Sequence, residues 1–403
     1  MMRIGVLGDG FLNWGGGIDF LRVVTSSLLH SSETLELHVL VPSRGPRLTA
    51  LSAARRAYRD AKALLGRGSV APQRVEIRHL VELAGSAERG IALHEIDIGN
   101  SAIVKAARTL SLDVLIPAIT PLPSGFPVPW VGYIYDFQHR YFPQLFSPAE
   151  CAQRDKQFSA MLESARAVIV NARTVAADIA RFHPEARARI FALPFSAAPQ
   201  AAWLVPCESP ASKYGIEKPY FIVCNQFWTH KDHATAFAAF AQIAATHPDV
   251  DLVCTGTTSD YRDPEHFPAL RHALARDGIS HRVHILGMVP KADQIALVKG
   301  AIALIQPTLF EGGPGGGAVY DAVSLGVRCV VSDIAVNLEL SEPGISFFPA
   351  GDVSALATLL SVAIGHPCAL DRDADMLRQR GQARRAACGA QVLAAIRHAR
   401  DRR

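Results

Sequence analysis

Short apolar runs alternate with helical segments along most of the chain, and this alternation limits the possible folds more than any other sequence feature. It is typical of parallel sheets that are covered by helices on both faces. In the first half, the pattern predicts strands at 3–7, 37–41, 75–80, 114–117, 131–135, 168–170 and 190–193. In the second half, it predicts strands at 220–224, 250–255, 283–287, 301–306, 329–332 and 346–348. We therefore expect an α/β protein.

The chain of 403 residues is too long for one ordinary hydrophobic core, and its 49% hydrophobic content is enough to fill two. Residues 195–219 are rich in Pro, Ala and Ser with little periodicity, which is typical of a linker. We place the domains at 1–204 and 205–372, followed by a helical tail at 373–403 that can pack back on the first domain. Two doubly wound domains would bind ligands at the carboxyl ends of their strands, across a shared cleft.

The cysteines and the apolar runs indicate the cellular compartment of the protein. Seven scattered cysteines without a CxxC pair favour a reducing cytoplasm over a disulfide framework or a structural zinc site. No apolar run approaches the roughly 20 residues that span a bilayer. The N-terminal sequence reaches an acid and glycines too early for a signal peptide, so we interpret it as a buried strand. We expect a cytoplasmic protein.

Basic residues gather between 44 and 67, although the net charge of the whole chain is only +4. The cations alternate with apolar residues and are Arg44, Arg47, Arg55, Arg56, Arg59, Lys62 and Arg67. Such a basic amphipathic helix either has an ordinary solvated face or lies on anionic lipid at the inner face of the membrane. We expect no nucleic-acid partner, because neither an RNP-like aromatic run nor zinc-finger spacing accompanies the arginines.

The stretch 309–322 holds five glycines and a proline, with the carboxylates Glu311 and Asp321 on either side. An apolar strand precedes it and a helical pattern follows, so unpaired N–H groups and the positive end of a helix dipole converge on the loop. Glycines let the backbone approach an anion closely. The carboxylates can accept hydrogen bonds from hydroxyl groups. Together these features predict a sugar-nucleotide site.

Six segments carry a resemblance to a known family. They are 13–17, 136–143, 225–233, 284–290, 309–322 and 326–333. Together they resemble the retaining glycosyltransferases of family 4, which have the GT-B architecture of two Rossmann-like domains facing each other across a cleft. The resemblance implies transfer of a hexose-type sugar from a GDP- or UDP-linked donor. The implied acceptor is a glycan or a lipid-linked molecule in bacterial cell-surface polysaccharide synthesis.

The resemblance implies neither a metal nor a cofactor, since the nucleotide sugar is a substrate. The DxD matches at 371–373 and 373–375 lie in a polar tail and do not indicate a divalent-cation site. The implied reaction retains anomeric configuration, yet no carboxylate stands out as a nucleophile for double displacement. Our hypothesis is that an oxygen of the departing phosphate acts as the base for the acceptor.

The resemblance assigns four residues to the reaction itself. Glu311 would orient the transferred sugar by accepting hydrogen bonds from its hydroxyls. Lys231 would neutralise the leaving diphosphate, which is the main electrostatic demand of the reaction. His139 would contact the acceptor or the sugar near its reacting carbon. Asp136 would either orient His139 or cap a turn.

Other residues are expected to bind the donor. Asp321 would accept from ribose hydroxyls, unless it only caps its helix. Gly315, Gly316 and Gly317 would donate N–H groups to the distal phosphate. The remaining predicted binding residues are Asn225 and Gln226 as neutral donors, Met288 and Val289 beside the base, Ala318, and Gly15, Gly16 and Gly17 at a second helix terminus suited to an anion or a tight turn.

Two positions depart from the family pattern. Glu311 and Asp321 are ten positions apart (321 − 311), whereas the family sets two glutamates eight apart. We interpret this as a glycine-rich insertion followed by an aspartate, whose side chain is shorter than that of the family's glutamate. The family's arginine five positions before its lysine is Gln226 here (231 − 5). One cation at the phosphates is therefore missing or supplied from elsewhere.

Three alternatives remain open at this stage. The first is an NADP-dependent oxidoreductase, because 8–13 is close to GxGxxG and Ser43 with Arg44 would suit a 2′-phosphate. This alternative gives Glu311 and Asp321 no purpose. The second is a sugar-nucleotide epimerase or hydrolase on the same architecture. The third is an inactive binding protein.

Overall fold

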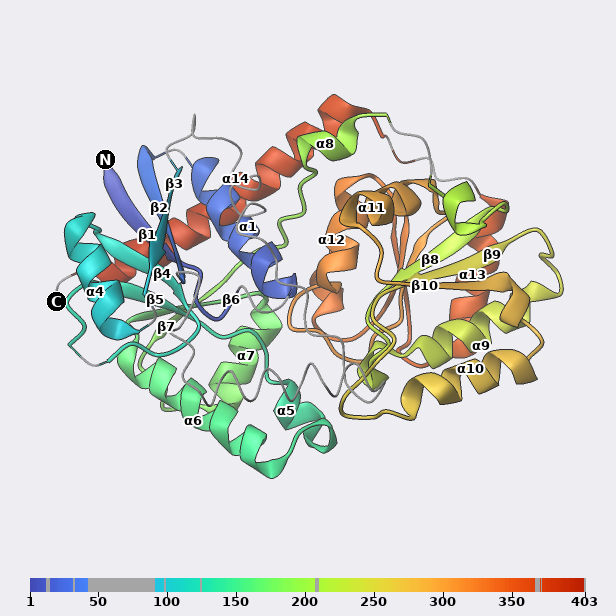
Figure 1. Cartoon of the computed structure of the whole chain (residues 1–403), viewed down its shortest axis with the longest axis horizontal. Coiled ribbons are helices and arrows are strands. Elements are labelled where there is room, and N and C mark those ends of the chain that lie inside the picture. The colour runs from blue at the N-terminus through green and yellow to red at the C-terminus, as the bar shows by residue number, and fades with distance from the viewer. Residues whose placement is uncertain are drawn as a thin grey trace, which may run out of the picture.

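The protein consists of two α/β lobes, each built on its own parallel sheet (Figure 1). The computed structural model describes residues 1–11, 15–31, 33–42, 91–97, 99–123, 125–206, 210–366, 370 and 372–401. The predicted strand at 75–80 and the basic segment 44–67 lie outside these residues, so both stay predictions.

Within the described residues, the first sheet has seven parallel strands in the order β3-β2-β1-β4-β5-β6-β7. The strands are β1 (Met2–Leu7), β2 (Leu35–Pro42), β3 (Ile91–Ile96), β4 (Val114–Ala118), β5 (Trp130–Tyr133), β6 (Ala167–Val170) and β7 (Arg189–Ala192). The α-helices of this part of the chain are α1 (Gly15–Leu29), α4 (Asn100–Thr109), α5 (Gln138–Tyr141), α6 (Pro148–Ser164), α7 (Arg173–Phe182) and α8 (Ala201–Leu204).

The second sheet has six parallel strands in the order β10-β9-β8-β11-β12-β13. The strands are β8 (Tyr220–Cys224), β9 (Asp251–Thr255), β10 (Val283–Gly287), β11 (Leu304–Gln306), β12 (Cys329–Ser332) and β13 (Ile345–Phe348). The α-helices are α9 (His233–Ala244), α10 (His266–Arg276), α11 (Lys291–Gly300), α12 (Gly316–Ser324), α13 (Val353–Gly365) and α14 (Ala374–Arg400).

Both sheets are buried on both faces, which confirms the predicted pair of Rossmann-like domains. In β4, Val114 and Ile116 belong to one hydrophobic core while Leu115 belongs to another. In β8, Phe221 and Ile222 likewise belong to different cores. Successive side chains of a strand point to opposite faces, so continuous apolar runs fill a core on each side.

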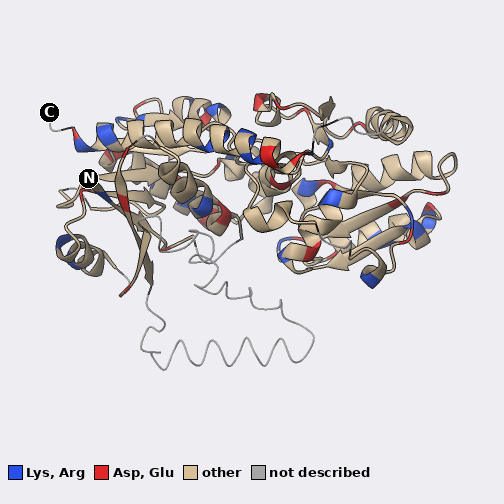
Figure 2. Ribbon diagram, turned by 90° about the horizontal axis from the view of Figure 1, so that it is seen from above, with Lys and Arg blue, Asp and Glu red and all other residues tan. Residues whose placement is uncertain are grey.

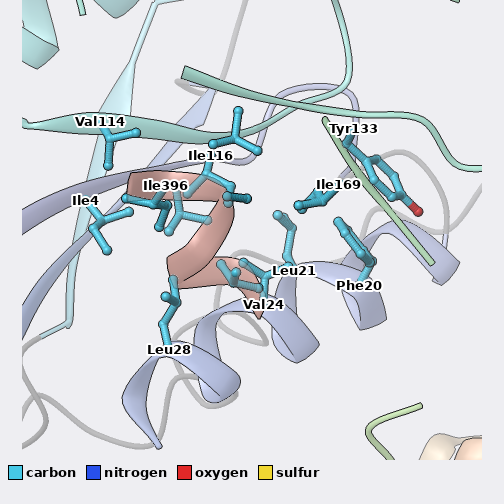
Figure 3. Close-up of a cluster of buried hydrophobic side chains, with 14 of the residues drawn as sticks. Ile4, Phe20, Leu21, Val24, Leu28, Val114, Ile116, Tyr133, Ile169 and Ile396 are labelled. Atoms are coloured by element: carbon cyan, nitrogen blue, oxygen red, sulfur yellow. The ribbon is translucent and has the colours of Figure 1, made fainter. Parts of the chain in front are cut away.

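Helix α14 leaves the second lobe and packs on the first (Figure 1). Its Ile396 lies among Leu21 and Val24 of α1 and Ile116 of β4 (Figure 3). The helices approach closely at Gly389, where an added Cβ would lie 2.2 Å from the Ser27 carbonyl oxygen. The exact domain boundaries of the sequence analysis stay predictions.

Two strands differ from the sequence pattern. The edge strand β3 was not predicted, because it carries His94 and Glu95 and is only partly buried, so it lacks a continuous apolar run. The expected strand 301–306 is shorter, since α11 continues to Gly300 and β11 begins at Leu304. Within the described residues, no helix is both long and apolar enough to cross a membrane.

Candidate active site

The candidate site begins at the carboxyl ends of neighbouring strands in the second sheet. Asn225 follows β8, and Gln306 ends β11. Gly256 follows β9 with a φ of 133°, and an added Cβ there would lie 2.1 Å from the Asn225 carbonyl oxygen. Only glycine fits this close approach of two backbones. Parallel strands thus bring these polar residues to one edge of the sheet.

Lys231 and Glu311 form a buried ion pair at this edge. The Lys231 Nζ lies 2.5 Å from Glu311 Oε1, and the two side chains are only 11% and 10% exposed. Their loops are tied together by backbone, since the Leu309 N–H donates to the His230 carbonyl at 2.8 Å. Asp232, with a φ of 51°, ends the 3-10 turn Thr229–Lys231 and caps α9. The structure thus brings together two predicted residues that lie 80 positions apart.

A buried amide extends this pair to the end of β8. The Gln306 Nε2 donates to Glu311 Oε1 at 2.9 Å, and the Asn225 Nδ2 donates to Gln306 Oε1 at 2.8 Å. Gln306 is fully buried and was not predicted as a site residue. The available signal was a glutamine that ends an otherwise apolar strand, because a buried amide needs partners. Gln306 fixes the orientation of the Glu311 carboxylate.

Some N–H groups of the glycine loop, residues 312–317, already donate hydrogen bonds within the protein. The Gly315 N–H donates to Oδ1 of the buried Asn337 at 2.7 Å, and the Gly316 N–H donates to the Gly313 carbonyl at 3.2 Å. Two of the three predicted phosphate donors are therefore engaged within the protein. Gly317 and Ala318 lie in the first turn of α12, where N–H groups have no intrahelical acceptor. Their role at an anion site stays a prediction.

Gly316 also sets how near the glycine loop comes to the Glu311 carboxylate. Its φ is 62°, and an added Cβ would lie 3.1 Å from both Glu311 carboxylate oxygens. A side chain at this position would be strained in its backbone and would crowd Glu311.

Asp321 lies one turn into α12 and binds the Lys291 ammonium of α11. Burial raises the pKa of Asp321, while the charge of Lys291 opposes this rise. Asp19 and Arg22 of α1 act electrostatically on the same carboxylate. Lys291 was not predicted, because a single lysine at a helix start has no distinctive signal.

Gly15, Gly16 and Gly17 form the first turn of α1. Figure 1 shows this end of α1 beside α12 of the second lobe, and the charge of Asp19 helps to raise the pKa of Asp321. The two helix starts that the sequence predicts as anion sites therefore belong to facing lobes.

His139 is buried and binds a carboxylate of α6. Its side chain is 0% exposed, and its Nε2 lies 2.8 Å from Asp155 Oδ1. Its ring packs against Phe137, Phe146 and Phe158. Burial lowers the pKa of His139, although Asp155 opposes the effect. The carboxylate that orients His139 is Asp155, which the sequence analysis missed.

Asp136 instead caps the turn that begins α5. Its Oδ1 accepts from the Gln138 N–H at 2.9 Å and lies 3.5 Å from Arg154 Nη1. Burial raises the pKa of Asp136; Gln138 and Arg154 oppose the rise, and Glu311 adds to it. Of the two predicted roles for Asp136, the structure shows the turn cap.

The glycine loop touches the first lobe beside Asp136. An added Cβ on Gly312 would lie 2.7 Å from the Tyr135 carbonyl oxygen and 3.0 Å from the Asp136 Cβ. The Phe310 ring lies 5.7 Å from the ring of Tyr141. These contacts place Glu311 and Asp136 on facing surfaces of the two lobes.

Three predicted binding residues lie at the edge of this arrangement. Met288 is 70% exposed and, with Val289, follows β10. Gln226 is exposed directly after Asn225. Within the described ranges, no group of three or more His, Cys, Asp or Glu side chains is arranged to hold a metal ion.

Residues 210–382 match the family model described as "Glycosyl transferases group 1". The protein is a glycosyltransferase. The matched segment contains the Lys231–Glu311 pair, the glycine loop and Asp321. A search of curated proteins found no match.

Solved structures that resemble the chain share its fold over the whole length. Sucrose-phosphate synthase from Thermosynechococcus elongatus superposes with a TM-score of 0.64 at 14% identity, covering 98% of each chain. HepE from Anabaena, solved with UDP and glucose, gives 0.63 at 14% identity, covering 98% of this chain and 99% of that one. A UDP-forming trehalose-phosphate synthase from Burkholderia xenovorans gives 0.59 at 12% identity, covering 98% and 99%. The likeness establishes the two-lobed fold.

Proposed function

We propose that this glycosyltransferase is a retaining enzyme of family 4. It moves a hexose-type sugar from a GDP- or UDP-linked donor to a glycan or lipid-linked acceptor in bacterial cell-surface polysaccharide synthesis. The observation that carries the proposal is the buried Lys231–Glu311 pair beside the start of α12. It joins a cation for phosphate, an acceptor for sugar hydroxyls and a helix N-terminus at one point.

Glu311 holds the sugar in this proposal. Among the described residues, Glu311 accepts from Lys231 and Gln306, and both donors bind Oε1. Oε2 is therefore available to accept a hydrogen bond from a sugar hydroxyl. An oriented carboxylate of this kind lowers the reorganisation needed as positive charge develops at the anomeric carbon.

Lys231 and the α12 amides stabilise the leaving group. Negative charge grows on the departing diphosphate as the glycosidic bond to phosphate breaks. The Lys231 ammonium, the Gly317 and Ala318 amides and the helix dipole all favour that charge. The proposal includes no metal and no cofactor. The proton of the acceptor hydroxyl passes to an oxygen of the departing phosphate.

The names of similar structures support the donor class. HepE from Anabaena was solved with UDP-glucose as well as with UDP. WaaG, a glycosyltransferase involved in lipopolysaccharide biosynthesis, shares the fold with a TM-score of 0.54 at 13% identity.

We infer a cytoplasmic enzyme that meets anionic lipid through residues 44–67. Basic and acidic residues are interspersed along the ribbons of both lobes (Figure 2).

A binding and transfer experiment tests the proposal. UDP or GDP at about 100 times its dissociation constant should stabilise the fold by about 2.7 kcal/mol in a thermal-shift measurement. Transfer from UDP- and GDP-sugars to lipid-linked glycans should then give a product whose anomeric configuration, read by NMR, matches the donor.

Three outcomes would contradict it. NADPH binding without nucleoside-diphosphate binding would indicate an oxidoreductase. Isomerised nucleotide or free sugar without an acceptor would indicate an epimerase or a hydrolase. Nucleotide binding without turnover on any acceptor would indicate an inactive binding protein.

A further inference from the structure

The charge at the proposed phosphate site is incomplete. Lys231 is already paired with Glu311 at 2.5 Å, so its positive charge is largely balanced before a donor binds. Gln226, exposed at the end of β8, is neutral. A leaving diphosphate carries more than one negative charge. One further cation, Arg262, lies beside the segment 226–231.

The loop after β9 runs alongside this segment. The Phe227 N–H donates to the Thr257 carbonyl at 2.9 Å, and Gly256 packs against the backbone of Asn225 and Gln226. At the far end of the loop, the Arg262 guanidinium lies over the Trp228 ring, 4.8 Å from its centroid. The Trp228 carbonyl in turn accepts the Lys231 N–H at 2.8 Å. Arg262 and Lys231 thus both contact Trp228, Arg262 through the ring and Lys231 through the backbone.

Arg262 is held rigidly by a buried carboxylate. Its Nε lies 2.8 Å from Asp260 Oδ1 and its Nη2 lies 2.9 Å from Oδ2, while Asp260 is only 1% exposed. The Arg262 side chain itself is 9% exposed. No described residue accepts a hydrogen bond from Nη1, which keeps two N–H donors for a ligand. A fixed guanidinium of this kind suits a phosphate oxygen.

The charge of Arg262 affects the pKa of His230, in the 3-10 turn Thr229–Lys231, and that of Glu150 in the first lobe. Burial lowers the pKa of His230 to about 2, and the charges of Lys231 and Arg262 both add to the effect. Hydrogen bonds from Ser147 lower the pKa of Glu150 at the start of α6, with Arg262 contributing. The effect on His230 agrees with the position of Arg262 over Trp228, beside the 3-10 turn Thr229–Lys231.

We propose that Arg262 binds the diphosphate of the nucleotide-sugar donor through Nη1 and replaces the cation that is lacking at Gln226. This inference rests on the proposed function, because it assumes a nucleoside-diphosphate sugar. Trp228 supports the flat face of the guanidinium, and Asp260 sets its direction. Arg262 binds the leaving group together with Lys231, and no protein residue changes its protonation.

The experiment compares binding of a nucleoside diphosphate and its monophosphate by calorimetry, with UDP and UMP or with GDP and GMP, whichever pair wild type binds more tightly. Arg262→Gln should weaken diphosphate binding about tenfold, the expected loss for one charge-assisted contact. Monophosphate binding should change less, because the second phosphate is absent. Adding Gln226→Arg to the Arg262→Gln variant should restore diphosphate affinity.

Arg276 provides a matched control. It makes the same two-pronged contact with Asp277, at 2.8 and 3.1 Å, but its side chain is 74% exposed at the end of α10. Arg276→Gln should leave both affinities unchanged. Should Arg262→Gln melt earlier than wild type, Arg262→Lys keeps the charge and should retain most of the diphosphate affinity.

The outcomes separate this inference from the proposed function. If wild type binds neither UDP nor GDP, the proposed function fails and the role of Arg262 fails with it. If wild type binds a diphosphate and Arg262→Gln binds it equally well, only the role of Arg262 is wrong. Equal losses for diphosphate and monophosphate, without rescue by Gln226→Arg, would show that Arg262 only maintains the loop.

Discussion

At the scale of single residues, the site depends on side chains whose charges are buried and paired. Lys231 and Glu311 contact each other at 2.5 Å with little exposure. Removing one partner of such a pair leaves the other buried without its counter-charge, which is costly. In the proposed function, the same closeness lets one pair bind both the phosphate and the sugar of a donor.

Lys231→Gln should lower kcat by about 100-fold or more, because it removes charge stabilisation from the leaving diphosphate. The measurement is the transfer rate at saturating donor, with a melting curve to show that the variant is folded. Lys213→Gln is the control, since it breaks a Lys–Asp pair of similar length, 2.7 Å, whose lysine is 61% exposed. A Lys231→Gln enzyme with the kcat of wild type would contradict the assignment.

His233 predicts a pH dependence of stability. It is fully buried, stacks on Phe227 at 4.0 Å, and burial lowers its pKa to about 3. A neutral imidazole is thus favoured in the fold, while an unfolded histidine takes up a proton near pH 6.5. Its contribution to stability is full above that pH and is lost as the pH falls toward 3.

His233→Phe should therefore reduce the loss of stability between pH 7 and pH 5 by about 2 kcal/mol. Urea unfolding at both pH values measures this difference. His272→Phe, at an exposed position of α10, is the control and should unfold with the pH dependence of wild type. Parallel pH profiles for wild type and His233→Phe would show that the histidine is not held neutral.

At the scale of elements, one short segment links the glycine loop to the first lobe. The 3-10 turn Asn337–Glu339 holds Gly315 through Asn337 at 2.7 Å. Two residues later, the Glu339 carboxylate accepts the Thr174 N–H at 2.7 Å and the Arg173 N–H at 3.0 Å. Helix α7 has no side-chain cap of its own at Ala172. Its N-terminal cap thus comes from the other lobe.

Glu339→Ala should destabilise the protein by about 1–2 kcal/mol, as expected for loss of an N-terminal cap. It should also raise hydrogen exchange at the start of α7 and at Gly315, since the same turn contacts both. Exchange detected by mass spectrometry measures the two effects together. Glu185→Ala, at an exposed position after α7, is the control. Increased exchange at α7 alone would show that the turn does not couple the two regions.

At the scale of the whole molecule, α14 fastens the end of the chain to the first sheet. Gly389 permits this contact, because an added Cβ would lie 2.2 Å from the backbone oxygen of Ser27. Because backbone atoms of both helices meet at this contact, neither α1 nor α14 has much room to adjust. The return of α14 therefore depends on a glycine in the middle of a helix, where glycine is otherwise unfavourable.

Gly389→Ala should destabilise the protein by about 1–3 kcal/mol, because overpacking outweighs the better helix propensity of alanine. Gly365→Ala is the matched control, since no described residue outside its own helical turn lies within 4 Å of its added Cβ at the end of α13. That variant should be as stable as wild type or more so. Chemical unfolding measures both, and equal stability of the two variants would show that α14 can shift to relieve the contact.

The sequence by itself determined the elements whose signal is local. Apolar runs such as 114–117 and 220–224 specify strands, and glycines ahead of Ala318 specify a loop followed by a helix, because period and backbone freedom act over a few residues. The same local reasoning missed β3, an edge strand that carries His94 and Glu95 and is only partly buried. It also missed Gln306, a polar residue that its neighbours in the sheet bury.

Tertiary structure alone decided which polar groups meet. It paired His139 with Asp155 and Asp321 with Lys291, and it engaged the Gly315 amide with Asn337. It also placed Glu339 of the second lobe on α7 of the first. Hydrogen bonds and ion pairs of this kind depend on distances between residues far apart in the chain, and packing of the two sheets sets those distances.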